Sequence, residues 1–194
     1  GNDLREQDVE IDLASIKAGI ENAYNDSDKL MSDSEVEQTY LAFQKYRYNN
    51  HKIKEEKIIK LNIEEGKSFL EKNRLKTGVV TYENGLQYKI IKKGTGKKPK
   101  KDSVVSIHFI DKFVDGNVFY NTYEKVNPVQ FQIGNPPKGW SLILPLMQEG
   151  AIWELYLPGS LAYAEKPIPN MGPFKMVITR LELVEIVDDL KLKE

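Results

Sequence analysis

The stretch Gly85-Leu86-Gln87-Tyr88-Lys89-Ile90-Ile91-Lys92-Lys93-Gly94-Thr95-Gly96 decides the fold class of this chain. It leaves a turn, continues as a run of β-forming residues and ends in a glycine- and lysine-rich loop, which is the pattern of a single strand. Helical periodicity precedes it, and short β-rich runs follow it to about Ile186. The stretch therefore marks where a helical arm gives way to an all-β binding module.

A helical stripe opens the first part of the chain. Apolar residues recur there at three- and four-residue steps, at Leu13, Ile16, Ile20 and Tyr24. This spacing places them on one side of a helix, and that side must pack against something. The polar segment 25–28 should end this helix.

A second helix is expected from Ser32-Asp33-Ser34-Glu35, which has the form of a capping box. From about residue 49 to residue 76, charged residues dominate and apolar residues are too sparse to form a broad buried face. This segment predicts a long, mostly solvent-exposed spacer helix. The helical arm thus covers residues 1–77.

The second half, residues 78–194, has the texture of an antiparallel sheet. Its β-rich runs are residues 79–82, 86–91, 104–110, 153–157 and 176–186, and turn signals separate them. Only residues 139–147 look helical, and Pro145 should shorten or kink that helix because it lacks an N–H. An antiparallel sheet wrapped on one short helix, preceded by an all-α arm, is an α+β fold.

Composition excludes several classes of function. The net charge is −1, and the lysine-rich segment 92–101 lacks interleaved aromatic residues, so no nucleic-acid partner is expected. The chain has no cysteine, and its two histidines lie far apart, so neither a metal nor another cofactor is expected. No apolar stretch approaches the roughly 20 residues of a membrane span. A removed export signal would leave no trace in this sequence.

The order and chemistry of these segments resemble the FKBP-type peptidyl-prolyl isomerases, in particular the exported, two-part subgroup typified by the macrophage infectivity potentiator. Residues 65–73, 78–80 and 85–88 are similar to the junction between helix and barrel in that subgroup, and residues 30–39 and 42–44 to its dimerising arm. The downstream matches are Val118-Phe119, Gly139-Trp140, 147–150, 153–158 and Leu161-Ala162-Tyr163.

The resemblance implies a peptidyl-prolyl cis-trans isomerase and folding chaperone that acts on unfolded or proline-containing polypeptides. It also implies a homodimer formed through the arm, and an exported, periplasmic or outer-membrane-associated location. The alternative is an FKBP-like binding module or chaperone that has lost isomerase turnover.

The resemblance places an apolar, proline-binding slot on a small set of residues. Trp140 would form its floor, with Phe119, Phe109, Val129 and Tyr163 around it. Trp140, Tyr163 and Phe119 are the candidate catalytic residues. For Phe109 and Phe119, a purely structural role in the core is an equally good interpretation, because aromatic residues in strands are usually core.

Several positions depart from the family pattern and suggest reduced activity. Tyr120 stands where the family has an acid, so the pocket carboxylate is expected to be absent. Pro136 and Pro137 stand where the family has a Val-Ile pair, and Pro137 has no backbone N–H to offer a substrate carbonyl. Thr179 replaces a Phe, and Phe109 replaces a Tyr and loses its hydroxyl.

Overall fold

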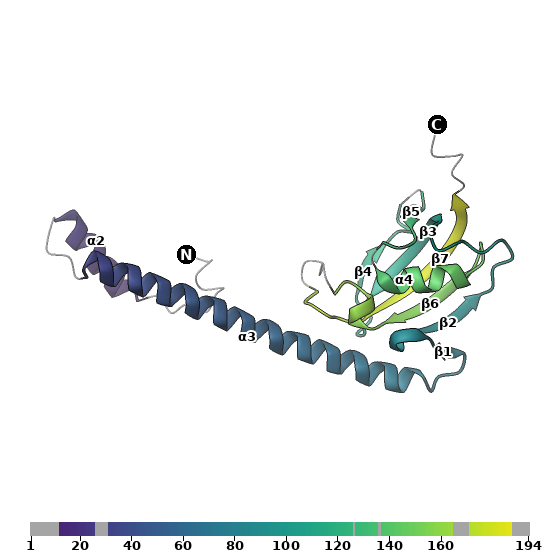
Figure 1. The fold of residues 1–194 in the computed structure, drawn as a ribbon, viewed down its shortest axis with the longest axis horizontal. Coiled ribbons are helices and arrows are strands. Elements are labelled where there is room, and N and C mark those ends of the chain that lie inside the picture. Colours follow the sequence, from purple (N-terminus) through teal and green to yellow (C-terminus); the bar gives the residue numbers. More distant parts are fainter. Residues whose placement is uncertain (1–11, 26–30, 126, 136, 165–170, 188–194) are drawn as a thin grey trace. The chain divides into compact units, whose positions relative to one another are not determined.

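The computed structural model describes residues 12–25, 31–125, 127–135, 137–164 and 171–187. The chain divides into two compact units, Gly1–Glu55 and Glu56–Glu194. Helix α2 and residues 33–55 of helix α3 belong to the first unit, and the rest of α3 and the sheet belong to the second (Figure 1).

Helix α2 spans Leu13–Tyr24, as the apolar stripe predicted. It begins after Asp12, whose carboxylate accepts a hydrogen bond from the Ala14 backbone N–H at 3.0 Å. The apolar stripe lies uncovered in the single chain, with exposed fractions from 49% at Ile16 to 89% at Tyr24. The partner that the pattern calls for is therefore not supplied by the described part of this chain.

Helix α3 spans Asp33–Asn73 and is continuous over 41 residues. The capping box at its start is confirmed: the Ser32 hydroxyl accepts from the Glu35 N–H at 3.3 Å, and the Glu35 carboxylate accepts from the Ser32 N–H at 2.8 Å. The predicted second helix and the predicted spacer helix are thus one element, because the sequence between them contains no glycine, proline or new cap.

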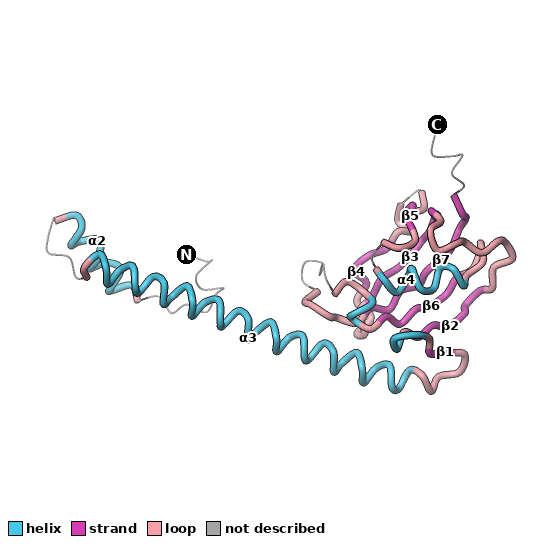
Figure 2. The backbone as a smooth tube through the Cα atoms, viewed as in Figure 1, coloured by secondary structure: helices cyan, strands magenta, loops and turns pink. Residues whose placement is uncertain are grey.

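An antiparallel sheet forms most of the second unit (Figure 2). Within the described residues it has seven strands, with β1-β2-β6-β7-β3-β4 side by side and β5 paired to β3. The strands are β1 (Val79–Thr81), β2 (Gln87–Lys92), β3 (Val104–Lys112), β4 (Val118–Asn121), β5 (Val129–Gln132), β6 (Ile152–Leu157) and β7 (Val177–Val187).

The short helix α4 (Lys138–Ile143) lies across one face of this sheet (Figure 1). It gives way to a 3-10 turn, η2 (Leu144–Leu146), so the predicted shortening of the helix at Pro145 is confirmed. Alternate residues of β3, β6 and β7 point toward α4 and form the main core with Trp140, Ile143 and Leu144.

The opposite face of the sheet packs against the last turns of α3, which the sequence did not predict. Phe69 lies 6.0 Å from Tyr156 of β6, measured between ring centroids. Gly66 lies against Met176, and the Asn62 side-chain amide donates to the Pro173 carbonyl at 2.8 Å. These turns therefore belong physically to the unit that contains the sheet.

Candidate functional site

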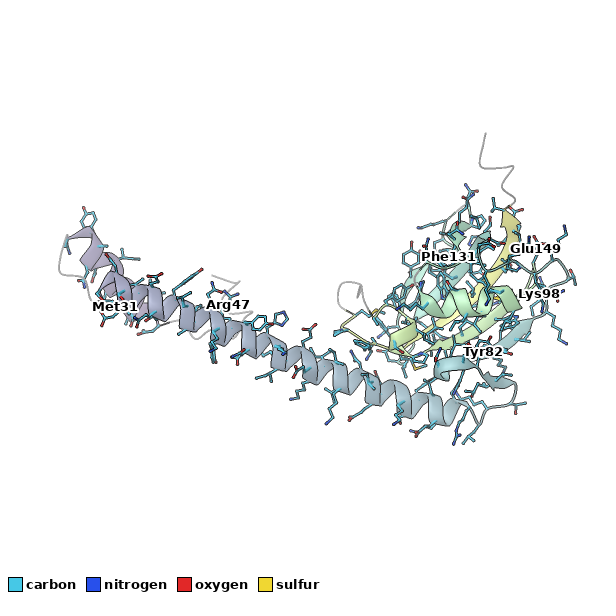
Figure 3. All side chains as sticks on the ribbon, in the orientation of Figure 1. Met31, Arg47, Tyr82, Lys98, Phe131 and Glu149 are labelled. Atoms are coloured by element: carbon cyan, nitrogen blue, oxygen red, sulfur yellow. The ribbon has the colours of Figure 1, made fainter. Side chains whose placement is uncertain are left out.

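Trp140 lies in the first turn of α4, pressed onto the sheet. Gly139 makes this approach possible, because a Cβ at that position would lie 2.6 Å from the Leu157 side chain. The Trp140 indole is 3% exposed. The edges of Phe109 and Phe131 flank it, with ring centroids at 4.5 and 5.4 Å and interplanar angles of 66° and 64° (Phe131 is labelled in Figure 3).

Tyr120 lies at the solvent edge of this aromatic group. Its ring stacks on Phe109 at 5.0 Å with an interplanar angle of 9°, and the residue stays 39% exposed. Its hydroxyl accepts a hydrogen bond from the Lys125 ammonium at 3.1 Å. The Tyr120 ring therefore covers Phe109 and faces outward.

Phe119 and Tyr163 form a second aromatic pair. Their ring centroids lie 6.2 Å apart at 78°, and Phe119 also stacks on Phe113 at 4.5 Å. Val129, on β5, is partly buried and packs against the main core. Pro137 is buried and precedes α4 as its N-cap, and its carbonyl accepts from the Trp140 N–H at 3.1 Å. Pro136 lies outside the described residues.

A buried carboxylate, Asp111 of β3, joins these groups. Its side chain has no exposure, and its two oxygens accept from the hydroxyls of Tyr163 at 2.6 Å and Thr179 at 2.5 Å. The Thr179 oxygen in turn accepts a long hydrogen bond, 3.4 Å, from the Trp140 indole N–H. Position 120 carries no acid, but a carboxylate that the sequence analysis did not name lies beside the proposed site residues.

The acid comes from the neighbouring strand, since Asp111 lies directly opposite Tyr120 in the β3–β4 ladder. Residues directly opposite each other point to the same face of a sheet. The sequence carried a signal for it, because Val105, Ile107 and Phe109 alternate toward the core and Asp111 continues that alternation. The predicted strand ended at residue 110 and so left Asp111 out.

Burial sets the acidity of the two groups at this contact. Removal from water raises the pKa of Asp111 to about 6, and the hydrogen bonds from Thr179 and Tyr163 offset part of that rise. Burial also raises the pKa of the Tyr163 phenol well above its usual value, and the adjacent Asp111 charge adds to the rise. Tyr163 is therefore a neutral hydroxyl, which can only donate one proton and accept at its oxygen.

An antiparallel sheet wrapped on one short helix, with Trp140 of that helix in contact with aromatic residues of the sheet, is the arrangement of an FKBP-type domain. Residues 95–184 match the family described as FKBP-type peptidyl-prolyl cis-trans isomerase. Residues 1–90 match the domain amino terminal to FKBP-type peptidyl-prolyl isomerase. The chain belongs to the FKBP-type peptidyl-prolyl cis-trans isomerase family.

Individual relatives share both halves of the chain. It is 33% identical to the peptidyl-prolyl cis-trans isomerase Mip of Coxiella burnetii, over 96% of this chain and 81% of that protein. It is 29% identical to the outer membrane protein MIP of Legionella longbeachae, over 96% of this chain and 80% of that protein. The crystal structure of FkpA from Escherichia coli superposes with a TM-score of 0.79 at 30% identity, covering 95% of this chain and 88% of that one.

These findings confirm the predicted resemblance, the predicted fold and the predicted activity, and they favour the isomerase over a binding module without turnover. The activity is the cis–trans isomerisation of peptide bonds that precede proline. In the portion of the chain that the structure describes, no helix combines the length and apolarity that crossing a bilayer requires.

Proposed function

We propose that the prolyl peptide binds over Trp140, between Phe109, Phe119 and Tyr163. The observation that carries this proposal is the setting of Trp140, a rigid apolar surface held from three sides by α4, Phe109 and Phe131. Tyr120, Val129, Pro136, Pro137 and Thr179 complete the proposed substrate-binding set.

The chemistry needs no nucleophile and no cofactor. Rotation about a prolyl bond has a barrier of about 18–20 kcal/mol, because amide resonance favours the planar form. An apolar surface that removes the amide from water disfavours that charge-separated planar form relative to the twisted one. Aromatic walls suit this task because they are rigid and apolar, and a small number of fixed hydrogen bonds hold the peptide while it turns.

The proposed site has few hydrogen-bond donors for the substrate, which supports a lower turnover than in a family member that has all of them. Phe109 has no hydroxyl, Pro137 has no N–H, and Tyr120 turns its hydroxyl to Lys125. Among the proposed site residues, the Tyr163 hydroxyl is the polar group best placed beside the aromatic floor. Each missing donor costs a modest amount, because one hydrogen bond contributes about 0.5–1.5 kcal/mol.

A rate measurement on two matched variants tests the slot. In an assay that follows isomerisation of a short prolyl peptide, Trp140→Ala should abolish the acceleration over the uncatalysed rate. Trp153→Ala is the control, because Trp153 is also a buried tryptophan of the same core, at 7% exposure, but it stacks on Tyr88 away from the proposed slot. Loss of activity in both variants, or in neither, would refute the assignment.

We also propose that the arm dimerises and widens the surface for unfolded clients. The support is the exposed apolar stripe of α2, together with Tyr40, Leu41, Tyr46 and Tyr48 of α3, which are 58–69% exposed. A single chain does not ordinarily leave so many large apolar residues in water. Light scattering should give a dimer for the intact chain and a monomer after deletion of residues 1–50; a monomeric intact chain would refute the proposal.

The functional division into an arm, residues 1–77, and an isomerase domain, residues 78–194, is part of the same proposal. We propose an exported location, in the periplasm or at the outer membrane; the Legionella relative, an outer membrane protein by name, supports it. Fractionation of cells that express the full gene would test it, and recovery in the cytoplasm alone would count against it.

A further inference from the structure

Asp111 is a buried acid, and its hydrogen-bond partners among the residues that the structure describes include no cation. Buried carboxylates are ordinarily paired with a cation, because an isolated charge is costly inside a protein. Here the partners are two neutral hydroxyls. The adjacent Lys112 is engaged elsewhere, since its ammonium pairs with Glu154 of β6 at 3.4 Å. Because a buried, unpaired charge does not favour folding, Asp111 is a candidate for a role in the neighbouring site.

The hydrogen bonds around the ionised acid have a fixed direction. A carboxylate can only accept, so both Tyr163 and Thr179 must donate their hydroxyl protons to Asp111. The Tyr163 proton is then committed to Asp111. In this state the phenol can offer a bound substrate only its oxygen lone pairs, and a substrate carbonyl gains no donor from it.

Protonation of Asp111 reverses one of these bonds. The Thr179 oxygen already accepts from the Trp140 indole N–H, and Thr179 is fully buried. A proton on the carboxylate oxygen that faces Tyr163 is therefore easier to accommodate, because Tyr163 is only partly buried. That oxygen then donates to the phenol, and the phenol proton becomes free to turn toward the proposed slot.

We propose that Asp111 is a positioning residue whose protonation decides whether Tyr163 can donate a hydrogen bond to the bound prolyl peptide. The proposal rests on the slot proposed above and adds control of its hydroxyl donor by pH. With Asp111 protonated, the site gains one donor at Tyr163; with Asp111 ionised, it loses that donor. Isomerase activity should therefore rise as the medium becomes mildly acidic.

Among the residues described around this contact, Asp111 is the group that titrates in this range. The residues that face it are Tyr120 from β4, Thr179 from β7, Tyr163 from the turn after β6 and, through Thr179, Trp140 from α4. The titratable groups among them are two phenols, so no second carboxyl or cation stands at these positions. Burial places the pKa of Asp111 at about 6, inside the range where the enzyme can be assayed.

The test is the pH profile of kcat/KM between pH 5 and pH 8 for the full chain, its Asp111→Asn variant and its Tyr163→Phe variant. Two-dimensional NMR exchange on a short prolyl peptide suits this range, because it needs no coupling protease. The wild-type value should rise about three- to tenfold from pH 8 to pH 5, the effect of one net hydrogen bond, with a midpoint near pH 6. Asp111→Asn and Tyr163→Phe should both give flat profiles.

The comparison with Tyr163→Phe carries the proposal even where Asp111→Asn fails to fold. The ratio of wild-type to Tyr163→Phe activity should rise about three- to tenfold between pH 8 and pH 5, whatever the activity of the variant at pH 8. A flat wild-type profile, or an unchanged rise in Asp111→Asn, would overturn the role of Asp111 and leave the slot intact. Absence of acceleration at every pH would overturn the slot itself, and this proposal with it.

Discussion

Replacement of Gly66 tests how tightly the last turns of α3 press on the sheet. A glycine inside a helix costs about 1 kcal/mol relative to alanine, so its presence there needs a packing reason. The reason is Met176, because a Cβ on residue 66 would lie 3.1 Å from the Met176 Cβ, and Met176 is fully buried. Gly66→Ala improves helix propensity but brings the new Cβ into a tight contact with Met176, so the free energy of unfolding should change little.

Gly66→Leu should be clearly destabilising. Overpacking a filled site costs about 1–3 kcal/mol, and the better helix propensity of leucine returns about 0.8 kcal/mol, which leaves a net loss of about 0.2–2.2 kcal/mol. With a urea dependence of about 2 kcal/mol per M, the unfolding midpoint should fall by up to about 1 M. The same substitution at Gly19 of α2 is the control, because a Cβ there meets nothing within 4 Å.

Intrinsic fluorescence reports this transition selectively. The chain has two tryptophans, Trp140 and Trp153, and both lie in the unit Glu56–Glu194. Gly66→Leu should lower the fluorescence midpoint, whereas Gly19→Leu should leave it unchanged. A Gly66→Leu midpoint equal to or above that of the wild type would show that α3 does not pack tightly against this face of the sheet.

Asp111 should also make stability fall with rising pH: its folded pKa of about 6 exceeds the ordinary value of 3.8, so the folded state binds more protons between these values. The contribution of Asp111 to the free energy of unfolding is complete below about pH 4 and is lost as the pH rises through 6, a change of up to about 3 kcal/mol. The difference between the urea midpoints at acid and neutral pH should be smaller in Asp111→Asn than in wild type. An unchanged difference would contradict the burial of the charge. Glu149, labelled in Figure 3, accepts from the Lys97 N–H at 3.1 Å and the Ile186 N–H at 2.8 Å. Glu149→Ala should cost about 1–3 kcal/mol in urea unfolding because it leaves both donors unpaired, and Glu149→Gln, which keeps an acceptor, should cost less; equal losses would refute this role.

Local signals in the sequence were enough to predict most of the elements. The capping box at Ser32 fixed the start of α3, and the missing N–H of Pro145 fixed the end of α4, because both effects act within one helical turn. The helix was predicted as mostly exposed, and the packing of its last turns on the sheet was missed. Asn62, Gly66 and Asn73 are the buried residues there, and polar or small residues give no hydrophobic periodicity.

The resemblance to the family was enough to name the aromatic residues of the proposed site, but not the buried acid beside them. Trp140 and Tyr163 lie together with the aromatic residues named for the slot, whereas Asp111 was missed. Its role depends on strand pairing, which brings residues 111, 163 and 179 together across long sequence separations. No local pattern encodes such a contact, and only the inward alternation of β3 hinted that an acid would point into the core.

The pairing of Asp111 with Tyr120 across the β3–β4 ladder makes substitutions at these two positions interdependent. An acid introduced at Tyr120 while Asp111 remains would set two carboxylates about 4.5–5.5 Å apart at the Cα atoms, and like charges so close cannot both ionise easily. The same acid in a chain that lacks Asp111 would supply a single charge and meet no such repulsion. A sequence with acids at both positions 111 and 120 is therefore unfavourable. A chain can move its acid from one position to the other more easily if it loses the existing acid before it gains the new one.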